Sequence, residues 1–132
     1  MAAHAPAPDL LTIEFEPSRQ LILVRWAGTC CRARLREAYD GVVALIRRTG
    51  AHRVLFDTRE REVIGLDDAR WVAGEAYAAM LQACRSKLRL AYAVPARVFE
   101  TYPPTQRQTV GELLQIAVFP TPVAATEWLL AG

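Results

Sequence analysis

The alternation of apolar and polar positions near the start of the chain predicts a β-hairpin. Leu11, Ile13 and Phe15 are apolar and their neighbours are polar, which is the period of a strand with one buried face. Residues 17–19 contain a proline and a serine and form a predicted turn, and residues 21–26 form the returning strand. We therefore expect two antiparallel strands at one edge of a sheet.

Helical periodicity begins after this hairpin. Thr29 is the expected N-cap of the first helix, because its hydroxyl can accept a hydrogen bond from a free backbone N–H group. Gly50 suits the position just after the last turn, where glycine adopts a left-handed conformation without strain. Four apolar residues at helical spacing form the expected buried face: Leu35, Tyr39, Val42 and Ile46.

The rest of the chain alternates between predicted strands and helices. The apolar run 54–56 ends in Asp57 and indicates a central strand buried on both faces. Asp67 is the expected N-cap of the second helix, and Thr121 followed by Pro122 begins the last one. The remaining predicted elements are a strand at 88–94, a shorter helix at Thr105–Leu114 and a strand at 116–119.

The resulting order, ββαβαβαβα, predicts an α/β fold. Right-handed crossovers give a three-layer domain with a mixed, mostly parallel five-stranded sheet, to which the hairpin adds an antiparallel edge strand. Residues 1–9 are rich in alanine and proline and are expected to form a disordered arm. Residues 10–132 then form a single domain, since a chain of 132 residues can bury a sufficient core.

Four segments carry a resemblance to a known family. They are 21–28 (LILVRWAG), 54–57 (VLFD), 90–94 (LAYAV) and 119–129 (FPTPVAATEWL). In this order they resemble the STAS fold of sporulation anti-sigma-factor antagonists and of sulfate-transporter C-termini, and most closely its SpoIIAA-like bacterial branch. The resemblance covers about residues 10–131. It implies a STAS-like domain that works without catalysis, by contacting other proteins.

The chain departs from that family where the antagonists are phosphorylated. Those proteins carry an Asp-Ser pair after the third strand, and the serine receives the phosphate. The matching stretch here, Glu60–Asp68, contains neither serine nor threonine, and Thr58 lies closer to the end of the strand. We therefore expect no phosphorylation site and no switch by a partner kinase.

Composition excludes several classes of partner. The formal net charge of +2 is too small to argue for a nucleic-acid or membrane partner. No apolar run approaches the ~20 residues that a membrane-spanning helix needs, and the N-terminus lacks the features of a signal peptide. The three cysteines are Cys30, Cys31 and Cys84. No two of them have the CxxC spacing, and they are expected to be reduced thiols. We therefore expect a soluble, cytoplasmic protein without a cofactor.

Nucleophilic catalysis and metal binding have no candidate residues in the sequence. His52 precedes a predicted strand, so it lies at the opposite end of the sheet from the strand-end crevice. No serine or cysteine is then within reach of a base, and no HxxxH or CxxC spacing suits a metal ion. We expect neither a catalytic residue nor a metal site, and no enzymatic activity.

The ends of the predicted strands provide the candidate ligand site. In open α/β sheets, ligands bind beyond the carboxyl ends of the strands. Asp57, Arg59 and Arg97 follow such ends, and the helix that begins after Thr29 offers free N–H groups to an anion. The open alternative is that Asp57 forms a salt bridge or caps a loop while both arginines are solvated.

Two functions of different class fit the sequence. The first is a non-enzymatic protein-interaction or regulatory module, which contacts a protein partner or a second copy of itself as a homodimer. The second is a binder of a small anionic or lipid-like ligand in the strand-end crevice. An exposed apolar helix face would favour the first function. A concave pocket over Asp57, with Arg59 and Arg97 pointing inward, would favour the second.

Overall fold

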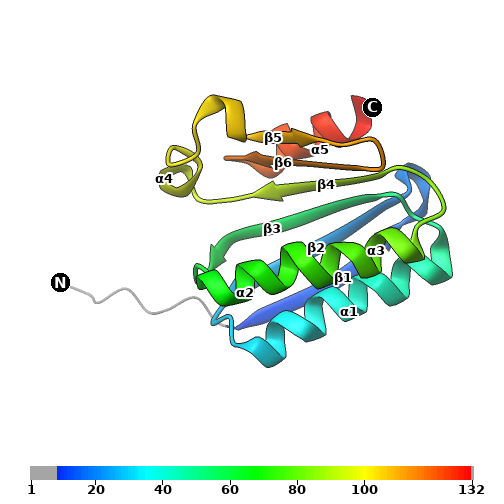
Figure 1. Cartoon of the computed structure of the whole chain (residues 1–132), viewed down its shortest axis with the longest axis horizontal. Coiled ribbons are helices and arrows are strands. Elements are labelled where there is room, and N and C mark those ends of the chain that lie inside the picture. Colours follow the sequence, from blue (N-terminus) through cyan, green and yellow to red (C-terminus); the bar gives the residue numbers. More distant parts are fainter. Residues whose placement is uncertain (1–8, 132) are drawn as a thin grey trace.

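A six-stranded mixed sheet forms the centre of the molecule (Figure 1). The structure, a computed structural model, describes residues 9–131. The strands are β1 (Leu10–Glu16), β2 (Leu21–Gly28), β3 (Arg53–Arg61), β4 (Leu88–Ala93), β5 (Gln108–Val110) and β6 (Leu114–Phe119), in the spatial order β1-β2-β3-β4-β6-β5. The four inner strands are parallel, and β1 and β5 are antiparallel to their neighbours. The mostly parallel α/β sheet and its antiparallel hairpin strand are confirmed, but the sheet has one strand more than the five expected.

The helices lie in two layers, one on each face of this sheet. They are α1 (Arg32–Thr49), α2 (Leu66–Trp71), α3 (Tyr77–Ala83), α4 (Ala96–Phe99) and α5 (Pro122–Ala131), and a π-helical segment, Val72–Ala76, joins α2 to α3. In Figure 1, α1 and the α2–α3 helix lie over the half of the sheet formed by β1, β2 and β3, while α5 lies against the opposite face. On the α1 side, β4 still packs against this helix layer through Leu88 and Leu90, whereas β6 and β5 lie beside it in Figure 1.

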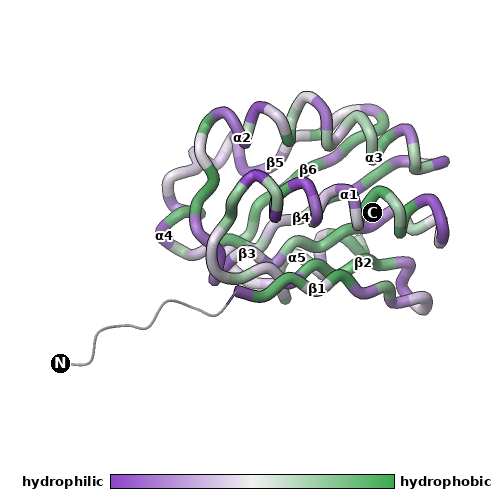
Figure 2. The backbone as a smooth tube through the Cα atoms, turned by 90° about the horizontal axis from the view of Figure 1, so that it is seen from below, coloured by the Kyte–Doolittle hydropathy of each residue, from purple (hydrophilic) through white to green (hydrophobic). Residues whose placement is uncertain are grey.

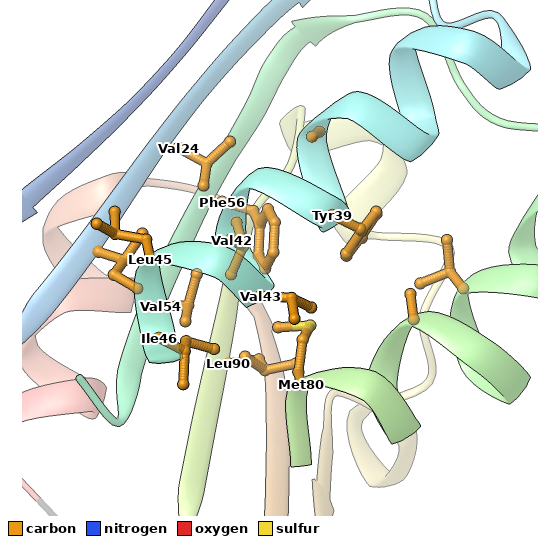
Figure 3. Packing of buried hydrophobic residues seen from close by; sticks show 14 of the residues in the cluster. Val24, Tyr39, Val42, Val43, Leu45, Ile46, Val54, Phe56, Met80 and Leu90 are labelled. Atoms are coloured by element: carbon orange, nitrogen blue, oxygen red, sulfur yellow. The ribbon is translucent and has the colours of Figure 1, made fainter. Parts of the chain in front are cut away.

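Two groups of buried apolar side chains hold the layers together. The larger group fills the space between the sheet and α1–α3 and includes Val24, Val42, Phe56, Met80 and Leu90 (Figure 3). The smaller group joins α5 to the other face and comprises Leu21, Leu55, Ala91, Ala125 and Leu129. Because successive residues of a strand point to opposite faces, Leu55 and Phe56 enter different groups, and the apolar run 54–56 is buried on both faces as predicted. Figure 2 shows hydrophobic residues concentrated along the central strands.

Several predicted helix boundaries are confirmed. Gly50 adopts a left-handed conformation (φ 73°) at the end of α1, and its N–H group donates to the Ile46 carbonyl. The Thr121 hydroxyl accepts a hydrogen bond from the Ala124 N–H group at 3.2 Å, which caps α5. All four residues of the predicted buried face of α1 are buried: Leu35, Tyr39, Val42 and Ile46.

The N-caps predicted for the first and second helices are wrong. Thr29 does not cap α1, because its N–H group and its hydroxyl both donate to the carboxylate of Asp9, and Cys31 occupies the N-cap position. Asp67 lies inside α2, whose N-cap is Gly65. Apart from Asp9, the arm predicted for residues 1–9 lies outside the described residues.

The predicted helix Thr105–Leu114 is also wrong. A 3-10 turn, Pro104–Gln106, leads into β5, which forms an antiparallel hairpin with β6. Gly111 allows the tight turn of this hairpin, since a Cβ atom there would lie only 2.9 Å from the Leu114 carbonyl oxygen. Hydrogen bonds with β6 hold residues 108–110 as a strand, and β3 likewise continues past Asp57 to Arg61 by pairing with β2.

Candidate functional site

A cavity of about 390 Å³ lies at the carboxyl ends of β3, β4 and β6. It opens where the sheet face leaves the cover of α1 and α3, and residues from α2, the π-helical segment, α4 and the 102–109 segment form its walls. The lining is mostly apolar and includes Val72, Val94, Val98, Ile116 and Val118. Its volume lies within the roughly 300–1,000 Å³ typical of small-molecule sites.

Three tyrosines, Tyr39, Tyr77 and Tyr92, form a hydrogen-bonded group in this cavity, here called the tyrosine trio. They come from α1, α3 and β4, and all three line the cavity. The Tyr92 hydroxyl lies 2.6 Å from that of Tyr39 and 2.8 Å from that of Tyr77, so it hydrogen-bonds to both. Tyr102, the fourth tyrosine of the chain, also lines the cavity but takes no part in these bonds.

Aromatic packing fixes the rings of the trio. The ring of Phe56 stacks on that of Tyr92, with centroids 4.7 Å apart and planes 9° from parallel. Tyr39 contacts the rings of Phe56, Trp26 and Trp71 at centroid distances of 5.2, 6.3 and 6.2 Å. Offset stacked and edge-to-face pairs of this kind are favourable beyond the area they bury. The trio is therefore anchored in the core from one side and borders the cavity on the other.

The π-helical segment lies directly before Tyr77. A π-helical turn holds an extra residue, so it changes the direction in which the following side chains project, and such turns are frequent at functional sites. Val72 and Ala73 of this segment line the cavity together with Tyr77. The π-helical segment thus lets one continuous helix provide both a wall of the cavity and the hydroxyl that reaches Tyr92.

Burial keeps the three phenols in their neutral form. Loss of solvation raises the pKa of Tyr39 and of Tyr77, and the positive charge of Arg61 opposes that rise only in part. Burial raises the pKa of Tyr92 as well, well above its usual range. A negative charge is therefore unfavourable at the position of the trio.

Raised tyrosine pKa values make the protein sensitive to alkaline pH. An unfolded tyrosine ionises near its ordinary pKa of 10.0, whereas the buried trio keeps its protons to higher pH. The contribution of the protonated trio to stability is thus complete below about pH 10. It is lost as the pH rises through the pKa values that the tyrosines have in the folded state. We expect the free energy of unfolding, measured by urea titration, to fall above about pH 10. A variant with phenylalanine at all three positions should show a smaller fall, and equal falls would contradict this explanation.

Two arginines complete the cavity. The Arg61 guanidinium lies over the ring of Trp26, 4.5 Å from its centroid, and that of Arg107 lies over Phe99 at 4.2 Å. Their Nε atoms donate to the carbonyls of Glu62 and Tyr102, respectively. Among residues 9–131, neither guanidinium forms an ion pair. Both can therefore provide charge and hydrogen-bond donors to an anionic group.

Of the four predicted ligand-site residues, the structure brings two together. Arg59 forms a two-pronged ion pair with Asp57, with both N–O distances 3.0 Å. This pair borders a second cavity of about 410 Å³, on the α5 face of the sheet, which Arg19 and Arg25 also line. Arg97 on α4 and Thr29 line neither of these two cavities. Ligand binding by these four residues stays a prediction. The observed ion pair is the salt bridge that the alternative interpretation expects for Asp57, and its partner is Arg59.

Thr58 and Cys30 are buried, whereas Cys31 is exposed and Cys84 is half-buried. Thr58 is 4% exposed, and its hydroxyl donates to the Ala93 carbonyl, so a kinase could reach it only after local opening of the sheet. All three cysteines are free, as expected. Cys30, near the start of α1, is buried, and burial raises the pKa of its thiol.

The tyrosine trio is not predicted from the sequence. Of its members, only Tyr39 has a predicted place, on the buried face of the first helix, and it is buried there. One signal was available: a buried phenol needs a hydrogen-bond partner, and three buried phenols can meet that need among themselves. The cavity next to them depends on helix placement, about which the sequence pattern contains no information.

None of the helices within residues 9–131 has the length and apolar character needed to cross a membrane. No three His, Cys, Asp or Glu side chains lie together as metal ligands in the part of the chain that the structure describes. A scan against protein-family models found no match for this chain, and a search of curated proteins found none either. The likeness to the STAS fold therefore rests on the four sequence segments and on the order of elements, and membership of that family stays a prediction.

Proposed function

We propose that this domain is a non-enzymatic binder of a small apolar or lipid-like molecule that carries an anionic group. The ligand occupies the cavity bordered by the tyrosine trio. The observation that carries this proposal is an apolar cavity of about 390 Å³ in which two guanidinium groups, those of Arg61 and Arg107, have no carboxylate partner among residues 9–131. The apolar walls suit the body of such a ligand, and the arginines suit its charged end.

The ion-paired arginine on the other face is a weaker candidate. Arg59 already has a carboxylate partner in Asp57, so an incoming anion would have to compete with that bond. The lining of the second cavity also has fewer apolar side chains, since it includes Arg19, Arg25 and Asp57. For a lipid-like ligand, the cavity beside the trio is therefore the better match.

Calorimetric titration with decanoate tests this proposal. Replacement of both free arginines (Arg61→Gln with Arg107→Gln) should weaken decanoate binding at least about tenfold, because hydrogen bonds to charged groups contribute ~1.5–3 kcal/mol each. Arg59→Gln is the matched control, since it removes an arginine from the other cavity, and it should leave the affinity unchanged. Loss of binding in Arg59→Gln alone would place the ligand in the second cavity, and an unchanged affinity in the double variant would refute the proposal.

A second candidate is the regulatory protein-interaction module that the family resemblance implies. The observation that favours it is a pair of exposed apolar side chains, Val63 in the loop after β3 and Leu66 at the start of α2, which are 67% and 66% exposed. Exposed apolar side chains that lie close together are typical of contact surfaces. The occupant we propose is a second copy of the chain, and native mass spectrometry at increasing concentration tests it. A dimer that Val63→Asp with Leu66→Asp converts to monomer would support it, and a monomer throughout would exclude it.

A further inference from the structure

The hydroxyl protons of the tyrosine trio can be counted. Three phenols carry three protons, and the group has two hydrogen bonds, both of them to Tyr92. Each bond uses one proton, whichever way the hydroxyls rotate. One phenolic proton is therefore always left without an acceptor inside the trio, and no further hydrogen bond of these hydroxyls occurs among residues 9–131.

This spare proton belongs to the cavity. All three tyrosines line it. Tyr39 is 2% exposed and Tyr77 and Tyr92 are half-buried, so whichever hydroxyl keeps the spare proton is largely withdrawn from bulk solvent. A buried donor without an acceptor is costly, which makes an acceptor at this position favourable. The same burial disfavours a charged acceptor, because it has lost its solvation. An uncharged oxygen atom meets both conditions.

We propose that the ligand carries, besides its anionic group, an uncharged oxygen acceptor at its buried end, such as a ketone, ether or hydroxyl oxygen, and that this oxygen accepts the spare proton of the tyrosine trio. The inference rests on the proposed function, because it assumes that a ligand enters this cavity. The anionic group lies toward Arg61 or Arg107, and the oxygen lies against the trio. The ligand class is thus an oxygenated apolar acid rather than a plain hydrocarbon acid.

Two matched probes test this inference: 4-acetylbenzoate, which has a ketone oxygen, and 4-isopropylbenzoate, in which a methyl group takes the place of that oxygen. The unaltered protein should bind the acetyl probe several-fold more tightly, up to about tenfold, which is the range of one net hydrogen bond. Replacement of all three trio tyrosines by phenylalanine should abolish or invert this preference. Tyr102→Phe is the control, since it removes a hydroxyl from the same lining but none from the trio, and it should keep the preference.

A spectroscopic measurement on the unaltered protein makes the test independent of whether the triple variant folds. The infrared stretching band of the ketone in bound 4-acetylbenzoate should lie at lower frequency than in a solvent without hydrogen-bond donors, because the carbonyl accepts a hydrogen bond, and it should lie equally low in Tyr102→Phe. An unshifted band, together with equal affinities for the two probes, would overturn the inference while leaving the proposed function intact. If neither probe nor decanoate binds, the proposed function itself fails, and the inference fails with it.

Discussion

Replacing Tyr92 by phenylalanine is expected to destabilise the protein more than replacing all three tyrosines of the trio. Tyr92 is the only hydrogen-bond partner of both other hydroxyls among residues 9–131. Its loss leaves two desolvated hydroxyls without partners, each of which costs about 1–3 kcal/mol, so the free energy of unfolding should fall by roughly 2–6 kcal/mol. The triple phenylalanine variant leaves no such group, and its loss should stay within about 1 kcal/mol.

Urea titration of the two variants, with the unaltered protein alongside, measures this difference. Tyr39→Phe and Tyr77→Phe provide intermediate cases, because each leaves one hydrogen-bonded pair in place. Tyr102→Phe serves as the control outside the trio and should change stability by less than about 0.5 kcal/mol. If Tyr92→Phe were as stable as the triple variant, the two hydroxyls would have other acceptors, and the count of one spare proton would be wrong.

Truncation of Phe56 to alanine is expected to cost roughly 3–5 kcal/mol, the usual range for a fully buried phenylalanine. Phe56 has no solvent exposure, and its ring contacts those of Tyr92 and Tyr39. Its removal opens a void beneath the trio, so the hydroxyls also lose the packing that positions them. Urea titration measures the loss of stability, and the affinity for decanoate measures the loss of positioning at the cavity. The two measurements together separate these effects.

Phe99→Ala provides the comparison for this experiment. Phe99 is half-buried on α4 and contacts Arg107 at the cavity rather than the core. We expect it to cost less stability than Phe56→Ala, because less apolar surface is buried and the remaining space is open to solvent. A cost below about 1 kcal/mol for Phe56→Ala would contradict the packing of the β3 layer against α1.

The hydrophobic pattern alone determined most of the central layers. Strand periodicity at residues 11–15, the apolar run 54–56 and the helical stripe of α1 depend only on which face of a local element is buried, and the structure confirms all three. Thr121 could be identified as a cap for the same reason, since its partner, Ala124, lies three residues away. The residues that decide such features lie within one element, so a short stretch of sequence includes all of them.

Pairing between distant segments decided the rest. Residues 105–114 contain enough apolar positions for a short helix, but hydrogen bonds with β6 make 108–110 a strand. Thr29 has the chemistry of an N-cap, yet the carboxylate of Asp9, 20 residues earlier, takes both of its donors. In each case the residue suits one local structure by its type, but its hydrogen bonds go to a partner far away in the sequence.

The candidate site belongs to this second group. The hydroxyls of the tyrosine trio come from α1, α3 and β4, and the pairs are separated by 53 and 15 residues in the chain. The sequence indicates that Tyr39 is buried, because the burial of a helix face follows from periodicity, and the structure confirms it. Only the tertiary structure determines that the three hydroxyls meet, since that depends on how α1 and the α2–α3 helix lie on the sheet. The same placement puts the cavity beside the trio, at the carboxyl ends of β3, β4 and β6.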